Sequence, residues 1–193
     1  MWFVTNATRP KAPRGLIELD GNSIRALTSD DLPALLSLRR TTPRDVFHIP
    51  TNQEGLDGFL DFMANKPWSL PMMCMRNGSP SGLCLMNVGQ LKHLNAYLVA
   101  LFEEPSSADR LLALYIRQAF WLFPLHRLNA QLPSRPEVQP HIDLLLRAGF
   151  QNEGVLKGHI EVDGQLSNVV VLGMLRDDFD AWCAINDPRL SLA

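Results

Sequence analysis

Residues 144–164, LLLRAGFQNEGVLKGHIEVDG, contain the clearest fold signal in this chain. Apolar residues at helical spacing stop at Gly149, Phe150 follows at once, and an alternating pattern begins within five residues. Glycine commonly ends a helix because it adopts a left-handed backbone conformation without steric cost. The stretch therefore predicts a helix over 137–148, joined by a tight turn to a strand over 153–162.

The faces of these two elements follow from the same periodicity. In the helix, four apolar side chains are expected to face inward: Val138, Ile142, Leu145 and Leu146. In the strand, one face is expected to carry Leu156, Ile160 and Val162, and the other Lys157, His159 and Glu161. Asp163-Gly164 then predicts a hairpin turn into a second, apolar strand over 168–175.

The rest of the chain predicts short strands and helices in alternation. Ser29 is expected to cap a helix that ends near Arg40, and Pro124 to stop a helix that starts near Ser106 or Ser107. The other expected helices cover 53–65 and 178–184. The other expected strands cover 16–19, 23–27, 70–76, 82–88, 94–102 and 127–132, and the run 94–102 is apolar enough for burial on both faces. This order indicates a mixed α/β class, with a mostly antiparallel sheet and helices on both faces.

Composition limits the classes of function. The chain has 193 residues, 46% of them hydrophobic and 20% charged, which suits one soluble domain, with an irregular arm over 1–15 and a tail over 176–193. A net charge of −2 gives no basic field for nucleic acid, and no apolar run is long enough to span a membrane. Cys74 and Cys84 are expected to be buried, inert thiols in a reducing cytoplasm. The histidines and cysteines lack metal-site spacing, so no metal is expected.

Four segments together resemble a known family. They are IELDGNSIRALTSDDLPALLSL at 17–38, LHRLNAQL at 125–132, LLLRAGFQNEGVL at 144–156 and VDGQLSNVVVLGMLRDDF at 162–179. In this order they resemble the GNAT superfamily of acyl-CoA N-acyltransferases, nearest the ribosomal-protein N-acetyltransferase type, over residues 16–178.

The resemblance implies a fold and a reaction. The central sheet should have seven strands and should splay open between its fourth and fifth strands, here 94–102 and 127–132. The acyl-pantetheine arm of acetyl-CoA, or of another acyl-CoA, should lie in that gap. The acceptor should be the amine of a small molecule or peptide, which attacks the thioester directly. The backbone N–H groups near Leu101 and Phe102 are expected to stabilise the developing oxyanion.

The resemblance also places the pyrophosphate of the donor at the N-terminus of the helix after residue 102, where free N–H groups favour an anion. The family has glycines there, whereas this chain has Glu103-Glu104-Pro105-Ser106-Ser107-Ala108-Asp109-Arg110. The carboxylates repel phosphate and proline lacks an N–H donor, although the two serines and Arg110 could bind one. We therefore expect weak binding of free CoA. Alternatively, the segment Ser106–Asp109 is simply a helix N-cap.

Candidate catalytic residues come from the same resemblance. Glu103 or Glu104 lies where the family commonly keeps its general base, although paired glutamates at a strand end can also be plain solvated residues. Val138 and His141 match positions that touch the pantetheine arm and protonate the departing thiolate. His141 is therefore a candidate imidazolium acid, or else a half-exposed surface histidine.

Two other functions stay open at this stage. The chain could be a non-catalytic GNAT-fold module for binding or assembly. It could also take its acyl group from an acyl carrier protein, which would remove the need for a pyrophosphate site. The acceptor, the acyl chain length and the oligomeric state, a homodimer included, are not fixed by the sequence.

Overall fold

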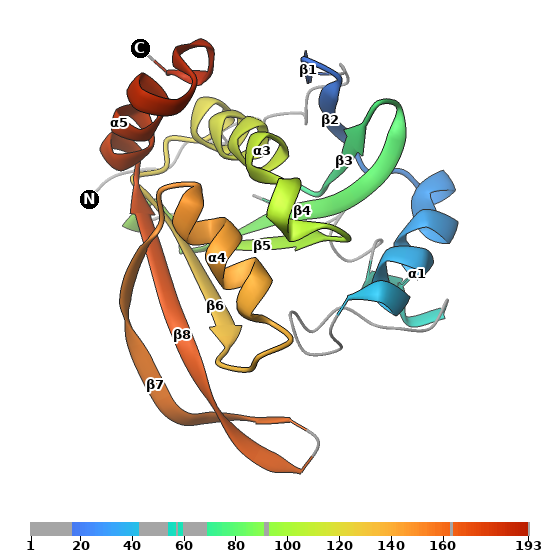
Figure 1. Cartoon of the computed structure of the whole chain (residues 1–193), viewed down its shortest axis with the longest axis vertical. Helices are drawn as coiled ribbons and strands as arrows, with labels where there is room; N and C mark the ends of the chain where they lie inside the picture. The colour runs from blue at the N-terminus through green and yellow to red at the C-terminus, as the bar shows by residue number, and fades with distance from the viewer. Residues whose placement is uncertain are drawn as a thin grey trace, which may run out of the picture.

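The computed structural model describes residues 17–42, 54–56, 58–59, 69–90, 93–162 and 164–192. Within these ranges one sheet has eight strands in the order β1-β2-β3-β4-β5-β6-β8-β7 (Figure 1). The strands are β1 Ile17–Leu19, β2 Asn22–Ala26, β3 Met72–Arg76, β4 Ser79–Gln90, β5 Asn95–Phe102, β6 Arg127–Pro133, β7 Gln151–Val162 and β8 Gln165–Leu175. All neighbours are antiparallel except β5 and β6. The mixed α/β class with a mostly antiparallel sheet is confirmed. The sheet has eight strands rather than the seven that the resemblance implies, because the strand predicted over 16–19 pairs with β2 as a short edge strand, β1.

The helices follow the predicted order, with shifted ends. They are α1 Leu32–Thr41, α3 Asp109–Leu122, α4 Gln139–Arg147 and α5 Arg176–Asn186, with 3-10 turns η1 Ser29–Asp31, η3 Pro105–Ser107 and η4 Pro188–Leu190. The N-cap before η1 is Thr28 rather than Ser29, because Asp31 accepts hydrogen bonds from the Thr28 backbone and hydroxyl. The predicted helix over 53–65 lies largely outside the described residues, as does the arm over 1–15.

Helices pack on both faces of the sheet, as predicted. From α3, the hydroxyl of Tyr115 donates to the carbonyl of Leu70 over 2.7 Å. Burial, together with the nearby thiols of Cys84 and of Cys74 on β3, raises the pKa of Tyr115. The next residue back, Met73, points to the opposite face and lines a cavity together with Leu38 of α1. Cys74, Cys84 and Cys183 are free and buried, which confirms the prediction of buried thiols for the first two.

The junction between α4 and β7 forms as the sequence predicts. Gly149 has φ +99°, its N–H donates to the carbonyl of Leu146, and the N–H of Phe150 donates to the carbonyl of Leu145. These two bonds are the Schellman arrangement that satisfies the last carbonyls of a helix. A Cβ at Gly149 would lie 3.0 Å from the ring of Trp182, so close packing also favours glycine.

Two predicted faces need correction. Leu146 is 39% exposed, whereas Leu144 is fully buried, so the inward stripe of α4 is rotated toward Leu144. The strand β5 is not buried on both faces throughout, because Tyr97 near its start is 49% exposed.

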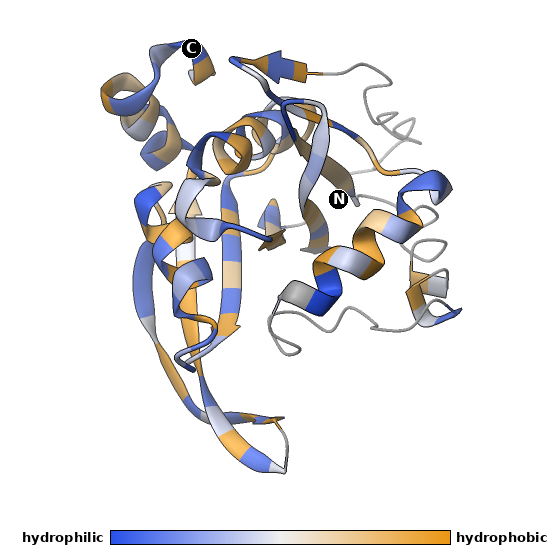
Figure 2. Ribbon diagram, turned by 45° about the vertical axis from the view of Figure 1, so that its right-hand side comes forward, coloured by the Kyte–Doolittle hydropathy of each residue, from blue (hydrophilic) through white to orange (hydrophobic). Residues whose placement is uncertain are grey.

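The β7–β8 hairpin projects beyond the body of the molecule, as Figure 1 shows. Hydrophobic and hydrophilic residues are interspersed along its outer part in Figure 2. Val162 is buried, but Leu156 is 37% exposed, so the predicted apolar face of β7 is covered at its end only. In the part of the chain that the structure describes, no helix is long and apolar enough to cross a membrane.

Candidate active site

The gap between β5 and β6 is the main irregularity of the sheet. The two strands are paired at only three positions, Asn95–Arg127, Ala96–Leu128 and Tyr97–Asn129. Beyond Tyr97 the parallel ladder ends, although β5 continues to Phe102 and β6 to Pro133. The predicted splay is therefore confirmed, and α4 lies across its open side in Figure 1.

The direction of each N–H group in β5 decides which ones face this gap. The N–H of Glu103 donates to the carbonyl of Ser81 on β4. Since antiparallel partners alternate between bonded and non-bonded pairs, the Leu101–Leu83 pair is also bonded, and the N–H of Leu101 points to β4. The prediction that Leu101 helps form an oxyanion site is therefore wrong. The N–H of Phe102 points into the gap, where the imidazole of His141 accepts it.

His141 on α4 closes the gap from the other side. The N–H of Phe102 donates to Nε2 of His141 over 3.4 Å, and Nδ1 of His141 has no hydrogen-bond partner among the described residues. The side chain is only 3% exposed, so the alternative of a half-exposed surface histidine is wrong. Burial lowers the pKa of His141 to about 4, which disfavours the imidazolium that a general acid would need at neutral pH.

Two cavities meet near the end of β5. The larger, about 420 Å³, is lined by Thr42, Phe102, Glu103, Pro105, Glu137, Pro140 and His141. The smaller, about 200 Å³, lies beside α1 and is lined by Ala34, Ser37, Leu38, Met73, Pro80, Ser81, Gly82 and Glu103. Glu103 is the residue that lines both cavities. It is also the one ionisable residue among those lining the smaller cavity.

The structure distinguishes the two neighbouring glutamates. The side chain of Glu104 is 72% exposed, and its carboxylate lies 3.3 Å from a guanidinium nitrogen of Arg76. The hydroxyl of Ser107 also donates to Glu104. Glu104 lines neither of these two cavities, whereas Glu103, which is also exposed, lines both.

The segment before α3 does not form the predicted N-cap. The residues Pro105–Ser107 form a 3-10 turn, in which the N–H of Ala108 donates to the carbonyl of Pro105. The helix then begins at Asp109, later than predicted, and its N-cap residue Ala108 makes no side-chain capping bond. The interpretation of the Ser106–Asp109 segment as a side-chain N-cap is therefore wrong, and Ser106 is exposed to solvent.

Two arginines from different elements donate hydrogen bonds to this 3-10 turn and the start of α3. Arg76 of β3 donates to the hydroxyl of Ser107 over 2.8 Å and to its carbonyl over 2.6 Å. Arg147 of α4 donates to the carboxylate of Asp109 over 2.8 Å and to the carbonyl of Pro105 over 3.0 Å. Neither arginine was a predicted site residue, because both lie far from the turn along the chain and form no local pattern with it. Only the fold brings them to the turn.

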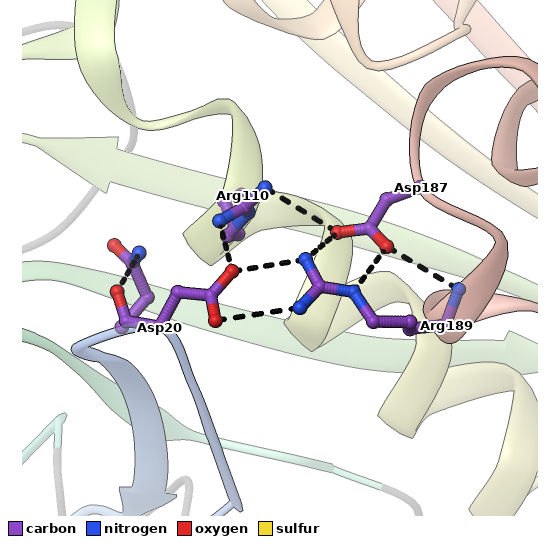
Figure 3. A network of polar contacts seen from close by, with 5 residues as sticks. Asp20, Arg110, Asp187 and Arg189 are labelled. Carbon is purple, nitrogen blue, oxygen red and sulfur yellow. Dashed lines mark hydrogen bonds and ion pairs between the residues drawn. The ribbon is translucent and has the colours of Figure 1, made fainter.

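Arg110, predicted to meet a phosphate, is occupied by carboxylates. It lies 2.6 Å from Asp20 of the β1–β2 turn and 3.4 Å from Asp187, and Arg189 bridges the same two carboxylates (Figure 3). The hydrogen bond from Arg189 holds the pKa of both Asp20 and Asp187 below the usual value. Both carboxylates therefore stay ionised and compete with any phosphate for the guanidinium of Arg110.

The two remaining residues predicted to contact the donor, Ala108 and Val138, lie in the core. The side chains of Ala108 and Val138 are fully buried, so neither offers exposed side-chain surface to a donor. For Val138 this geometry does not support the predicted contact with the pantetheine arm, whereas the call on Ala108, which concerns the backbone of the turn, stays a prediction. Among the described residues, no group of three histidine, cysteine or carboxylate side chains is arranged to hold a metal ion.

Comparison with known proteins gives the fold a name. No protein-family model matches the sequence, and no curated protein is significantly similar to it. Among solved structures, RimJ of Mycobacterium smegmatis in complex with CoA-disulfide has a TM-score of 0.69 and 19% identity, over 85% of this chain and 87% of that chain. The spermidine/spermine N-acetyltransferase SpeG from Vibrio cholerae, in a mutant form, has a TM-score of 0.70 and 15% identity, over 83% and 97%. At these identities the likeness concerns the fold, and the chain has the mixed α/β fold of the GNAT acetyltransferases.

Proposed function

We propose that this protein is an N-acyltransferase that moves an acyl group from a thioester to a primary amine in the gap between β5 and β6. The observation that carries the proposal is the junction of the two cavities at Glu103, directly beside the N–H of Phe102. A two-substrate reaction needs two adjoining spaces and a base between them.

The proposed reaction uses the cavities separately. The thioester occupies the larger cavity, beside Phe102 and His141, and the amine enters the smaller cavity, beside α1. Glu103 accepts a proton from the ammonium or attacking amine, and the nitrogen bonds to the thioester carbonyl carbon. The C–S bond then breaks and its electron pair leaves on sulfur. Because free thiols have a pKa of about 8.5, a thiolate is a workable leaving group without an imidazolium acid.

The donor is proposed to be recognised mainly through its pantetheine arm. The RimJ structure of similar fold holds a CoA-disulfide, which supports acetyl-CoA or another acyl-CoA as the donor. In this chain, however, two of the three side chains that could meet the diphosphate are engaged internally. Ser107 is bonded to Arg76, and Arg110 is paired with Asp20 and Asp187. We therefore expect weak affinity for the nucleotide half of CoA.

A second donor class is favoured by the same observation. An acyl group carried on the pantetheine of an acyl carrier protein presents the same arm without a diphosphate-linked nucleotide. Such a donor would not need Arg110, whose guanidinium is already held by Asp20 and Asp187.

The test is a thiol-release assay with acetyl-CoA or acetyl-pantetheine as donor and a panel of small amines and short peptides as acceptors. We expect amine-dependent thiol release with at least one acceptor. Release that is absent across both donors and the whole panel, for a folded protein, would contradict the proposal and favour a non-catalytic module. Release with acyl carrier protein alone would favour the carrier-linked donor.

A further inference from the structure

A third cavity lies beside the β1–β2 and β3–β4 turns and shares no described lining residue with the two cavities of the candidate active site. Its volume is about 390 Å³, which is within the range of small-molecule sites. The proposed acyl transfer uses none of its residues. The lining includes Glu18, Gly21, Ser23, Arg25, Met75 and Asn77.

The strand register places three of these side chains in one row. Glu18 of β1 is paired with Ser23 of β2, and Ser23 is paired with Met75 of β3. Directly paired residues point to the same face of a sheet, so the carboxylate, the hydroxyl and the thioether all face the third cavity. Asn77 joins them from the β3–β4 turn, where its backbone N–H donates to the carbonyl of Gly21 over 2.7 Å. A Cβ at Gly21 would lie 2.5 Å from Oδ1 of Asn77, so the carboxamide oxygen lies close against that turn.

The polar side chains of the third cavity have no partner among the described residues. Ser23 is only 6% exposed, yet its hydroxyl makes no hydrogen bond within this part of the chain. Buried polar groups nearly always have a partner, so an unpaired hydroxyl that lines a cavity needs an explanation. The carboxylate of Glu18 and the carboxamide of Asn77 are likewise unpaired within the described ranges. All three groups are therefore available to one ligand.

The charges around the third cavity favour a cation. The guanidinium of Arg25 donates to both carboxylate oxygens of Asp31, over 2.5 and 2.7 Å, so these two charges offset each other. Asp20 in the adjoining turn is already paired with two arginines (Figure 3). Among the described lining residues, the charge of Glu18 is therefore the one left without a counter-ion. An uncompensated carboxylate attracts a positively charged ligand.

The acceptor atoms indicate which kind of cation fits. A primary ammonium has three N–H donors, and the third cavity offers three matching acceptors in Glu18, Ser23 and Oδ1 of Asn77. A metal ion such as Ca²⁺ prefers several carboxylates, and no group of three metal-ligating side chains occurs in the described ranges. The flexible, apolar side chain of Met75 suits an alkyl chain.

We propose that the third cavity binds a primary alkylammonium ion. Its N–H groups donate to Glu18, Ser23 and Asn77, and its alkyl chain packs against Met75. This binding site goes beyond the proposed acyl transfer and does not depend on it.

Nuclear magnetic resonance of ¹⁵N-labelled protein, titrated with butylammonium chloride at constant ionic strength, tests the proposal. We expect the backbone amide signals of Ser23 and Asn77 to shift and to saturate at millimolar concentration. Butanol lacks the charge and tetramethylammonium lacks the N–H donors, so neither should saturate these shifts. The proposal is overturned if butylammonium causes no saturable shift, or if either control shifts the same signals as strongly.

Two variants identify the groups that bind. Glu18→Gln keeps the size of the side chain without its charge, and we expect it to weaken butylammonium binding by about tenfold. Ser23→Ala removes the hydroxyl and should weaken binding by about threefold or more. The matched control is Glu161→Gln on β7, which removes the same charge at the opposite edge of the sheet and should bind like the parent. Equal weakening by Glu18→Gln and Glu161→Gln would show unspecific charge attraction and contradict the site.

Two sources carry this chemistry: a free amine, or the far end of a long acceptor whose reacting nitrogen lies beside Glu103. The second source is open because Met75 is paired with Pro80, which lines the smaller cavity. Three strand spacings, roughly 14 Å, separate Ser23 on β2 from β5, and an extended diaminodecane spans about this distance.

Titration with diaminodecane distinguishes the two sources. Tighter binding than that of butylammonium, with the gain lost in Glu103→Gln, supports the site as the far end of an acceptor. Equal affinity of the two probes supports it as a site for a free amine. Diaminodecane that binds without shifting the Ser23 signal would overturn the proposal. None of these readouts requires turnover, so the site and the proposed function fail separately.

Discussion

The two edges of β5 differ although they belong to one strand. Along β4 the ladder runs through eight pairs, from Gly82–Phe102 to Gln90–Asn95, whereas along β6 it covers three. The closed edge satisfies its backbone groups within the sheet. The open edge leaves backbone groups of β5 available to other partners. Here Nε2 of His141 accepts a hydrogen bond from the N–H of Phe102. Backbone pairing is therefore concentrated on one side of β5, and the proposed chemistry lies on the other.

The largest expected effect comes from the open edge. Glu103→Gln removes the proposed base while keeping the size of the side chain, and we expect turnover to fall by about 10²-fold or more. Glu104→Gln is the matched control, because the neighbouring glutamate is paired with Arg76 and lines neither cavity. Steady-state thiol release measures both variants. Equal losses of turnover in the two variants would contradict the assignment of Glu103 as the base.

The second effect is the pH dependence of stability. The pKa of His141 is about 4 in the folded protein, below the ordinary value of 6.5, so the unfolded chain binds a proton between these values and the folded chain does not. The free energy of unfolding should therefore fall as pH drops from about 7 to 4, by ~3 kcal/mol from this residue.

Urea unfolding of the parent and of His141→Phe at several pH values isolates this contribution. The difference between the two proteins should change with pH over that window, whereas His159→Gln should follow the parent. A pH-independent difference would show that His141 is not held neutral by burial.

The third effect belongs to the closed edge and is smaller. A Cβ at Gly82 would lie 2.2 Å from the ring of Phe102 and 2.8 Å from the carbonyl oxygen of Leu101. Gly82→Ala should therefore destabilise the fold by ~1–3 kcal/mol through overpacking. Ser81→Ala on the same strand should change stability by less than about 0.5 kcal/mol. Urea midpoints measure both, and equal midpoints for Gly82→Ala and the parent would mean that the packing of Phe102 against this edge is not tight.

The sequence predicted the features that depend on local patterns. Gly149 ends α4 as expected, because a left-handed residue and the following apolar Phe150 are visible within a few positions. The divergence of β5 and β6 was implied by the family resemblance rather than by any residue property. The exposure of Leu146 was mispredicted, because helical spacing alone does not distinguish it from Leu144.

The site depended on contacts that no local pattern contains. Glu103 and Glu104 are chemically identical neighbours. Only the fold distinguishes them, because Glu103 lines the larger cavity and Glu104 is paired with Arg76. Arg76 and Arg147 reach the same 3-10 turn from β3 and α4. The neutral state of His141 arises from its burial, which the sequence did not predict, since it left open a half-exposed surface position.

We propose that the open edge of β5 binds an acyl-pantetheine arm and that the turn before α3 contributes little affinity for the diphosphate. Calorimetric titration with acetyl-CoA, and separately with acetyl-pantetheine, tests it most directly. We expect both to bind weakly and with similar affinity, because Arg110 and Ser107 are already engaged. Tight binding of acetyl-CoA that is lost with acetyl-pantetheine would contradict this account and show that the turn binds the diphosphate despite its carboxylates.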